Sequence, residues 1–373
     1  MIVWENCRGL IYQVQKIMDI VIFVLALSIL VLVHELGHFL AAKITGVRVE
    51  EFGLGLPPRI VGKKKWGTVW SLNWLPIGGF CKLFGEDINE KGATIKKDSF
   101  VSKNPWQKML IVLGGVMMNL VLAVIIFAVV YTILGVPKET DRVKIIGVAK
   151  NSPAEVAGLK ENDWVKSIGG VEIKKGGELT AQVEKNKGEK MELIIDREGQ
   201  EGQGIALSVQ IREIAPEGEG LMGVVISNTE MEKIKWYQFY RGIGAGFKEA
   251  YFWGKIIGEG VYKMIAELMV GQVPKDVSGP LGMYEATSSI RMNQGFLAMV
   301  HFFGVVSVNL AIVNVLPFPA LDGGRIIFVF YELLFKKKAN KKFEALVNNL
   351  GMMVLLGLIL LVTIGDVRRI FIK

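Results

Sequence analysis

The stretch VLVHELGHFL, residues 31–40, decides how the rest of the chain is interpreted. It contains an H-E-x-x-H pattern, formed by His34, Glu35 and His38. Helix positions four residues apart lie about 40° apart around the axis, so both imidazoles can reach a single metal ion. Glu35, beside the first histidine, can act on a water molecule bound to that metal. The pattern therefore predicts a metal site that activates water.

The residues before this pattern are apolar enough for a lipid bilayer. From Ile20 to Val33 the chain has no charged side chain. The whole chain is 51% hydrophobic, which is too apolar for an ordinary soluble domain of this length. A charged side chain at bilayer depth costs about 2.5–3.5 kcal/mol on insertion scales, so polar groups there usually have a function. We therefore expect the metal site to lie within a membrane.

Four long apolar segments predict an α-helical polytopic membrane protein. Each is close to the ~20 residues that a helical span requires. They comprise residues 19–42, 109–134, 296–316 and 346–364. Met18, directly before the first segment, is an alternative start of the chain to Met1.

Residues 236–271 are also apolar, but their charged side chains follow one stripe of a helix. The stripe consists of Arg241, Lys248, Lys255, Glu259 and Lys263. A helix with one charged face and aromatic residues elsewhere lies in the membrane interface. We therefore expect an interfacial amphipathic helix here and not a fifth span.

Basic residues gather in two loops. The loop 46–100 carries the run Lys63–Lys65, and the loop after the third apolar segment carries Lys336–Lys338. Short loops rich in lysine and arginine stay in the cytoplasm. We therefore expect both loops to be cytoplasmic and the region between the second and third spans to lie outside. The net charge of +8 is ascribed to this topology, because no nucleic-acid-binding motif accompanies it.

A metal held by two histidines needs at least a third protein ligand, for which two distant residues are candidates. His301 lies near the opposite end of its apolar segment, so we expect it to be structural or to contact lipid headgroups. Asp322, in NVLPFPALDGG, follows the third segment at the depth expected for the motif. Pro317 and Pro319 end a helix there, and Gly323–Gly324 would let the backbone turn. Asp322 is therefore the expected third ligand.

These motifs, in this order, resemble those of the site-2 protease family of intramembrane zinc metalloproteases. The first span carries H-E-x-x-H, and N-x-x-P-x-P-x-L-D-G ends the third. The glycine-rich stretches FGLGLPPRI (52–60) and LPIGGFCKLFGE (75–86) are similar to segments that the family folds into a membrane-associated β-hairpin region. GGVMMN, which ends at Asn119, matches the start of the second span, and VSGPLGM (277–283) matches the stretch before the third.

The resemblance implies a zinc-dependent endopeptidase that cleaves membrane-spanning segments of other proteins, such as an anti-sigma factor or remnant signal peptides. It implies that Zn²⁺ is held by His34, His38 and Asp322, with Glu35 as the general base. Asn309 and Asn314 match two asparagines that the family places beside the substrate. An unbroken helix would set them about 140° apart, so a single substrate-facing stripe is not guaranteed.

Residues 139–228 resemble a bacterial PDZ domain, an inserted α+β fold. SPAEVAGLKEND (152–163) matches the pattern SPA-x-x-AGL-x-x-x-D, and GEGLMGVVI (218–226) is similar to the strand and loop that line the peptide groove. PDZ domains commonly hold a chain end by adding it as a strand. The domain would bind a peptide or chain end, or it would exclude bulky substrates, and the sequence leaves both roles open.

The expected domains are two membrane halves around the PDZ domain and the interfacial helix. Their boundaries are 1–135 and 277–373 for the membrane halves, 139–228 for the PDZ domain and 236–271 for the helix. We expect a multi-pass protein of the bacterial plasma (inner) membrane, with the PDZ domain extracytoplasmic and the active site near the cytoplasmic side. Its expected partners are membrane-spanning protein substrates and the lipid bilayer, and not nucleic acid.

Two other classes of function fit parts of this pattern. A catalytically silent membrane adaptor or chaperone could use the same scaffold, although it need not keep His34, Glu35, His38 and Asp322 together. A divalent-metal transporter would require polar residues along its spans, and the second and fourth apolar segments offer almost none.

Overall fold

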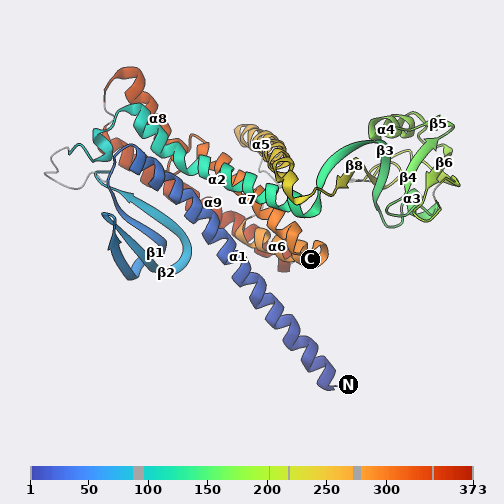
Figure 1. Cartoon of the computed structure of the whole chain (residues 1–373), viewed down its shortest axis with the longest axis horizontal. Coiled ribbons are helices and arrows are strands. Elements are labelled where there is room, and N and C mark those ends of the chain that lie inside the picture. Colours follow the sequence, from blue (N-terminus) through green and yellow to red (C-terminus); the bar gives the residue numbers. More distant parts are fainter. Residues whose placement is uncertain are drawn as a thin grey trace. The chain divides into compact units, whose positions relative to one another are not determined.

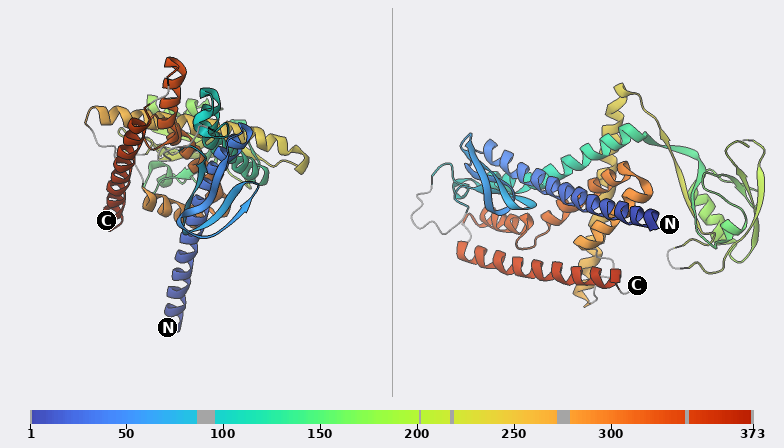
Figure 2. Two further views of the ribbon diagram at one scale, coloured as in Figure 1. Left: turned by 90° about the vertical axis from the view of Figure 1, so that its left-hand side faces the viewer. Right: turned by 90° about the horizontal axis from the view of Figure 1, so that it is seen from below.

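The computed structural model describes residues 2–86, 96–200, 202–216, 219–271, 279–337 and 340–371. These residues form two compact units. One contains residues up to Tyr131 and from Tyr237 onward, and the other contains Thr132–Trp236. The first unit is helical with one long β-hairpin, and the second is smaller and built around a sheet (Figures 1 and 2).

The helical unit contains four helices that are long and apolar enough to cross a membrane, counted among the described residues. The stretches concerned are Gln13–Ile44 of α1 (Ile2–Ile44), α2 (Pro105–Leu134), α7 (Phe296–Val315) and Lys342–Arg368 of α9 (Lys341–Phe371). Each contains most or all of one apolar segment expected from the sequence. Large apolar side chains remain exposed along α1, α2 and α9 and at both ends of α7, as the surface of a helix in lipid requires.

The remaining elements of this unit are shorter or amphipathic. They are β1 (Val49–Lys65), β2 (Thr68–Leu83), η1 (Phe100–Ser102), η2 (Trp236–Gln238), α5 (Phe239–Met269), α6 (Pro280–Gln294) and α8 (Asp322–Phe335). Strands β1 and β2 pair antiparallel and form the hairpin expected in the loop 46–100, of which residues 87–95 lie outside the described range. Lys248, Lys255 and Lys263 of α5 are exposed, and α5 is not among the candidate spans in the described part of the chain.

The smaller unit is a six-stranded antiparallel sheet with two short helices, as far as its residues are described. The strands are β3 (Val136–Val148), β4 (Trp164–Ile168), β5 (Val171–Glu172), β6 (Lys190–Asp196), β7 (Ile205–Gln210) and β8 (Val224–Glu232). Their order is β7-β6-β4-β3-β8, with β5 paired to β4. Helices α3 (Pro153–Val156) and α4 (Gly176–Lys185) complete the unit. It contains the stretch expected to form a PDZ domain, in which Glu201, Glu217 and Gly218 lie outside the described residues.

A buried ion pair ties two loops of the smaller unit together. Asp163, the last residue of the SPAEVAGLKEND stretch, is 1% exposed. Arg197 donates to both carboxylate oxygens, each at 2.7 Å, and the main-chain N–H of Lys160 donates to one of them at 2.8 Å. Such a bidentate pair is stronger and more specific in geometry than a neutral hydrogen bond. The loop between α3 and β4 is therefore anchored to the end of β6.

We expect Arg197→Met to destabilise the smaller unit by about 3 kcal/mol, because it leaves a buried carboxylate without its cation. This is the lower end of the range for buried pairs, since the Arg197 side chain is 26% exposed. Hydrogen–deuterium exchange of β4 and β6 peptides in the full-length protein would measure the change. Lys166→Met is the matched control, because its pair with Asp196 is more exposed and should contribute less than about 1 kcal/mol. Equal exchange in both variants would contradict this assignment.

Candidate active site and metal centre

Helices α1 and α2 approach each other closely where glycines face one another. A Cβ built on Gly37 would lie 2.1 Å from the carbonyl oxygen of Gly114, and one built on Gly114 would lie 2.6 Å from that of Gly37. No side chain fits at such distances. Small residues allow membrane helices to pack backbone to backbone in this way. The contact brings the H-E-x-x-H face of α1 directly onto α2.

Both histidines use α2 as a support. Nδ1 of His38 lies 2.8 Å from the carbonyl oxygen of Ile111, and Nδ1 of His34 lies 3.3 Å from the side-chain nitrogen of Asn119. Between them, a Cβ on Gly115 would lie 2.5 Å from Nε2 of His38 and 2.7 Å from Nε2 of His34. Because Gly115 has no side chain, the two rings have room to turn their Nε2 atoms toward each other.

Asp322 reaches the histidines from the first turn of α8. The turn that precedes it is made at Ala320, which has a φ of +76°. The expectation that Gly323–Gly324 turn the backbone is wrong in its mechanism, because neither has a positive φ. A Cβ on Gly323 would instead lie 2.0 Å from the carbonyl oxygen of Leu316, so glycine is required for close contact between α8 and the end of α7.

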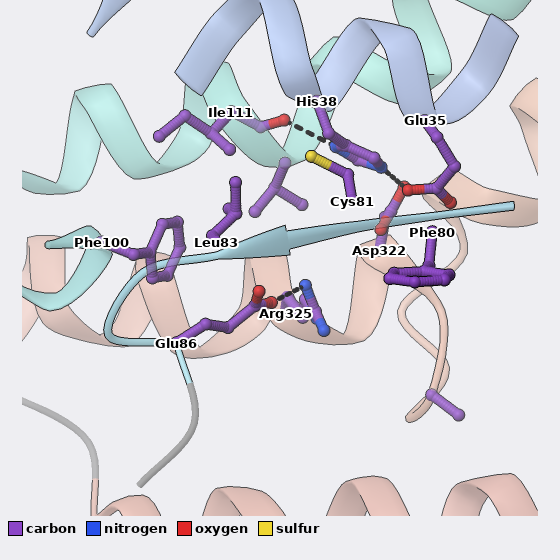
Figure 3. Close-up of a pocket in the computed structure, with 12 residues that line it drawn as sticks. Glu35, His38, Phe80, Cys81, Leu83, Glu86, Phe100, Ile111, Asp322 and Arg325 are labelled. Atoms are coloured by element: carbon purple, nitrogen blue, oxygen red, sulfur yellow. Dashed lines mark hydrogen bonds and ion pairs between the residues drawn. The ribbon is translucent and has the colours of Figure 1, made fainter. Parts of the chain in front are cut away.

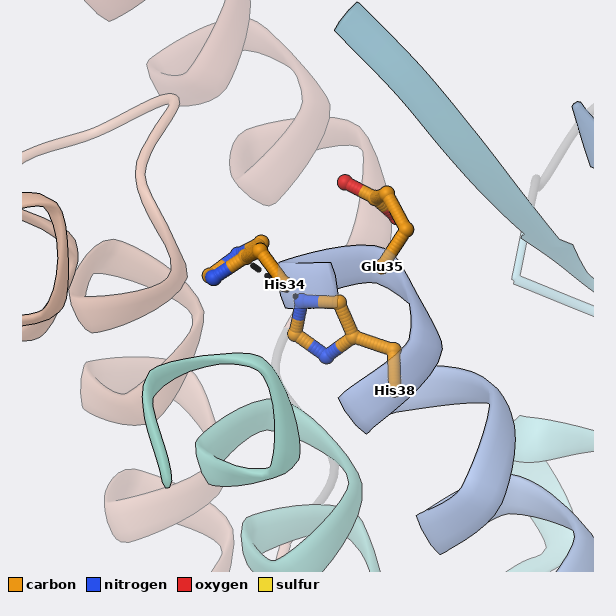
Figure 4. Close-up of side chains that lie close together, drawn as sticks. All are labelled: His34, Glu35 and His38. Atoms are coloured by element: carbon orange, nitrogen blue, oxygen red, sulfur yellow. Dashed lines mark hydrogen bonds between the residues drawn. The ribbon is translucent and has the colours of Figure 1, made fainter. Parts of the chain in front are cut away.

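Three ligand atoms meet at this point. Nε2 of His34 and Nε2 of His38 lie 3.2 Å apart, and Oδ2 of Asp322 lies 3.0 Å and 3.2 Å from them. Atoms bound ~2.0 Å from a tetrahedral zinc ion are about 3.3 Å apart, so the triangle matches one face of such a coordination shell. Figure 4 shows the two imidazoles side by side on α1 with Glu35 beside them.

The donor set also fits a cation in its electrostatics. Among the described residues, the buried Oδ2 of Asp322 has no hydrogen-bond partner besides the two imidazole nitrogens. The side chains of His34 and Asp322 are 10% and 14% exposed. A buried carboxylate requires a compensating positive charge. Zinc, which binds imidazole nitrogen and carboxylate oxygen, supplies that charge in a site of this composition.

Glu35 lines a pocket of about 260 Å³ together with His38 and Asp322. The ligand atoms of His34, Glu35 and His38 all lie within 4.8 Å of one another, so one water molecule can contact both the metal position and the Glu35 carboxylate. Strand β2 passes above Glu35 at Gly79, where a Cβ would lie 3.6 Å from Cγ of Glu35. Figure 3 shows the strand covering the side of the pocket that faces away from α1.

The pocket lining also contains an ion pair. Arg325, one turn after Asp322 on α8, pairs with Glu86, which follows the end of β2 (Figure 3). Both residues line the pocket, as does the thiol-bearing Cys81 of β2. The pair connects α8, which carries Asp322, to the hairpin beside the site.

The remaining candidate residues are not among the described residues that line this pocket. Asn309 and Asn314 are half-buried on α7, and neither is among the described residues that line the pocket, so their substrate contacts remain a prediction. His301 lies 3.0 Å from a carboxylate oxygen of Glu249 on α5, and its ring contacts that of Phe127 of α2 at a tilt of 48°. Burial favours a raised pKa for Glu249, but hydrogen bonds from His301 and its neighbours hold the pKa below its usual value.

Several residues of the site were not recognised from the sequence. Asn119 was noted as part of a motif and not as the partner of His34. The carbonyl of Ile111 carries no sequence signal, since every residue has one. The nearest available signal was the pair Gly114–Gly115 in an otherwise apolar span, because small residues mark close helix contacts.

We expect Gly115→Ala to abolish zinc retention while the protein still inserts and folds, because the new methyl group occupies the space between the imidazoles. Zinc content of the purified protein, measured by mass spectrometry, checks this. Gly357→Ala on α9 is the matched control, since nothing lies within 4 Å of its added Cβ, and it should keep full zinc content. A Gly115→Ala protein with a full complement of zinc would show that the rings do not meet at this point.

The chain is similar to known peptidases over most of its length. A protein-family model described as Peptidase family M50 matches residues 22–358. A zinc metalloprotease of Clostridium perfringens is 34% identical, over 94% of this chain and 98% of that protein. One of Campylobacter jejuni is 31% identical, over 93% and 92%.

The regulator of sigma-W protease RasP of Bacillus subtilis is 28% identical, over 94% of this chain and 99% of RasP. Among solved structures, the PDZ domain of an SdrC-like protein of Listeria monocytogenes is similar to 23% of the chain, with 18% identity and a TM-score of 0.20, a likeness too distant to define a fold. The match of the family model over most of the chain places this protein in peptidase family M50 and confirms the site-2 protease resemblance of its motifs.

Proposed function

We propose that this zinc metalloprotease of family M50 cleaves the membrane-spanning segments of other proteins at the triangle formed by His34, His38 and Asp322. The observation that carries the proposal is the convergence of Nε2, Nε2 and Oδ2 within 3.2 Å, with both histidines on the candidate span Gln13–Ile44 and Asp322 on α8. Three protein ligands leave a fourth position of a tetrahedral ion open, as catalytic zinc sites require. A structural zinc site would fill that position with protein.

Glu35 is the proposed general base. When bound, zinc polarises the scissile carbonyl and makes a water molecule acidic enough to be deprotonated near neutral pH. The Glu35 carboxylate takes the proton from that water and delivers it to the nitrogen of the leaving amine. His34 and His38 hold their Nε2 atoms inward, and the backbone contact of His38 to Ile111 fixes the orientation of its ring.

The substrate has to present unwound backbone to the pocket. In a helix the main-chain carbonyls are occupied by their own hydrogen bonds, and a membrane offers no water to replace them. A pocket of about 260 Å³ accommodates a few extended residues and not a whole helix. Asn309 and Asn314 are the proposed donors and acceptors for that unwound stretch. The proposed partners are therefore membrane proteins with a helix that unwinds locally, including a membrane-anchored regulator such as an anti-sigma factor.

The proposed orientation follows from the basic loops and the hairpin. Lys63–Lys65 belong to β1, and Lys336 and Lys337 follow α8. In Figure 1 the hairpin and α8 lie at the same end of the helical unit. Positive residues at one end favour a cytoplasmic location for that end of a bacterial membrane protein. The smaller unit is then extracytoplasmic, where we propose that residues 139–228 act as a PDZ domain and filter substrates by size or by their chain end.

We expect Glu35→Gln to abolish cleavage of a model membrane substrate while zinc content stays unchanged, because glutamine keeps the shape but cannot accept the proton. Asp322→Ala should lower both zinc content and activity, since it removes a ligand. Cleavage in purified, detergent-solubilised protein and zinc stoichiometry in the same sample check both. Residual cleavage by Glu35→Gln at the wild-type rate would overturn the assigned base, and full zinc in Asp322→Ala would overturn the third ligand.

Orientation is tested by cysteine labelling in intact spheroplasts, with Cys7 and Cys81 replaced by serine. We expect an impermeant maleimide to label Ser208→Cys, an exposed position of β7, without lysis. We expect Lys64→Cys in the hairpin to react with the maleimide only after the spheroplasts are lysed. The reverse pattern would place the smaller unit in the cytoplasm and rule out the proposed orientation.

A further inference from the structure

We propose that Asn119 is a positioning residue for the metal site, and that its side-chain oxygen accepts a hydrogen bond from Nδ1–H of His34 when zinc is bound. The inference rests on the zinc ligands proposed above. It adds a residue of α2, outside the H-E-x-x-H motif and the L-D-G motif, to the machinery that orients the metal.

Asn119 is fully buried, and only one of its two side-chain polar atoms has a hydrogen-bond partner among the described residues. Its exposed fraction is 0%, and its side-chain nitrogen lies 3.3 Å from Nδ1 of His34. Its side-chain oxygen has no hydrogen-bond partner among the described residues. Buried polar atoms without a partner are rare, and each one calls for a specific explanation.

The nitrogen and the oxygen of the Asn119 side chain favour different tautomers of His34. An N–H of Asn119 facing Nδ1 is compatible with a neutral imidazole whose proton is on Nε2. A metal ligand at Nε2 needs the opposite arrangement, with the lone pair on Nε2 and the proton on Nδ1. A half-turn of the amide, which preserves its shape, places the unpartnered oxygen on that Nδ1–H. This single rotation gives the side-chain oxygen of Asn119 a hydrogen-bond partner and stabilises the tautomer of His34 that can bind a metal at Nε2.

His38 shows the same arrangement with a fixed acceptor. Its Nδ1 faces the carbonyl oxygen of Ile111 at 2.8 Å, and a carbonyl can only accept. The tautomer of His38 is therefore set by the backbone of α2 with Nε2 free for the metal. His34 depends on a side chain for the same purpose, so among the two histidines it is the one whose tautomer a substitution can change.

A residue of α7 also hydrogen-bonds to the main chain of Asn119. The hydroxyl of Ser307, a residue with 0% exposure, donates to the main-chain oxygen of Asn119 at 2.8 Å. This bond leaves the amide side chain free to turn. It also supplies a matched control, because Ser307→Ala disturbs the same buried contact without removing the acceptor for His34.

The test compares Asn119→Leu, Asn119→Asp and Ser307→Ala in the full-length protein in detergent. Zinc affinity is measured by competition with a chromogenic chelator, and the ligand field by the visible spectrum of the cobalt-substituted protein. We expect Asn119→Leu to weaken zinc binding about 10–100-fold and to alter the cobalt spectrum, as is typical when a metal ligand loses its hydrogen-bond partner. Asn119→Asp, in which both ends are acceptors, should bind zinc at least as tightly as wild type. Ser307→Ala should resemble wild type.

Each other outcome contradicts the proposal. Wild-type affinity and spectrum in Asn119→Leu would show that His34 needs no partner there. A loss in Asn119→Asp equal to that in Asn119→Leu would show that Asn119 donates to Nδ1 or only fills space, and this variant decides the question even if the leucine protein does not fold. Failure of the wild-type protein to bind zinc at all would refute the metal site itself, and so differs from a failure of this inference.

Discussion

The close contact between α1 and α2 is the constraint on which the site depends. Gly37 and Gly114 let the two backbones touch, and this places both imidazoles against the second helix. The contacts to the Nδ1 atoms of both rings then come from α2, through the carbonyl of Ile111 and the amide of Asn119. The H-E-x-x-H motif alone supplies two imidazoles on one face. The direction in which those rings point is a property of the helix opposite.

Asp322, the proposed third ligand, is placed by a second close contact at the far end of the chain. Ala320, which has a left-handed backbone conformation, turns the chain after α7. The absence of a side chain at Gly323 lets the first turn of α8 contact the main chain at the end of α7. Asp322 therefore projects from a short helix held tightly on both sides. Catalytic groups have to be held to a fraction of an ångström, and rigid backbone contacts achieve this more reliably than loops.

The sequence was sufficient for those features of the site that depend on local spacing. His34, Glu35 and His38 share one helix face because of their spacing alone, and Asp322 could be matched to them by its depth in the membrane. The role of Gly323, the space at Gly115 and the pair between Arg325 and Glu86 could not be predicted. They depend on which faces of distant elements meet, and no local period encodes that. His301 was correctly excluded from the metal site, since it pairs with Glu249 on α5.

The three proposed ligands come from opposite ends of the chain, and this has a consequence for biogenesis. The two histidines are synthesised and inserted early, whereas the carboxylate that completes the set follows only after the smaller unit, α5, α6 and α7 have been made. With two imidazoles alone, a nascent chain in the membrane holds the metal weakly. The proposed zinc site is therefore complete only when most of the polypeptide has been synthesised. Until then, the growing chain cannot cleave the unfolded helices near which it is inserted.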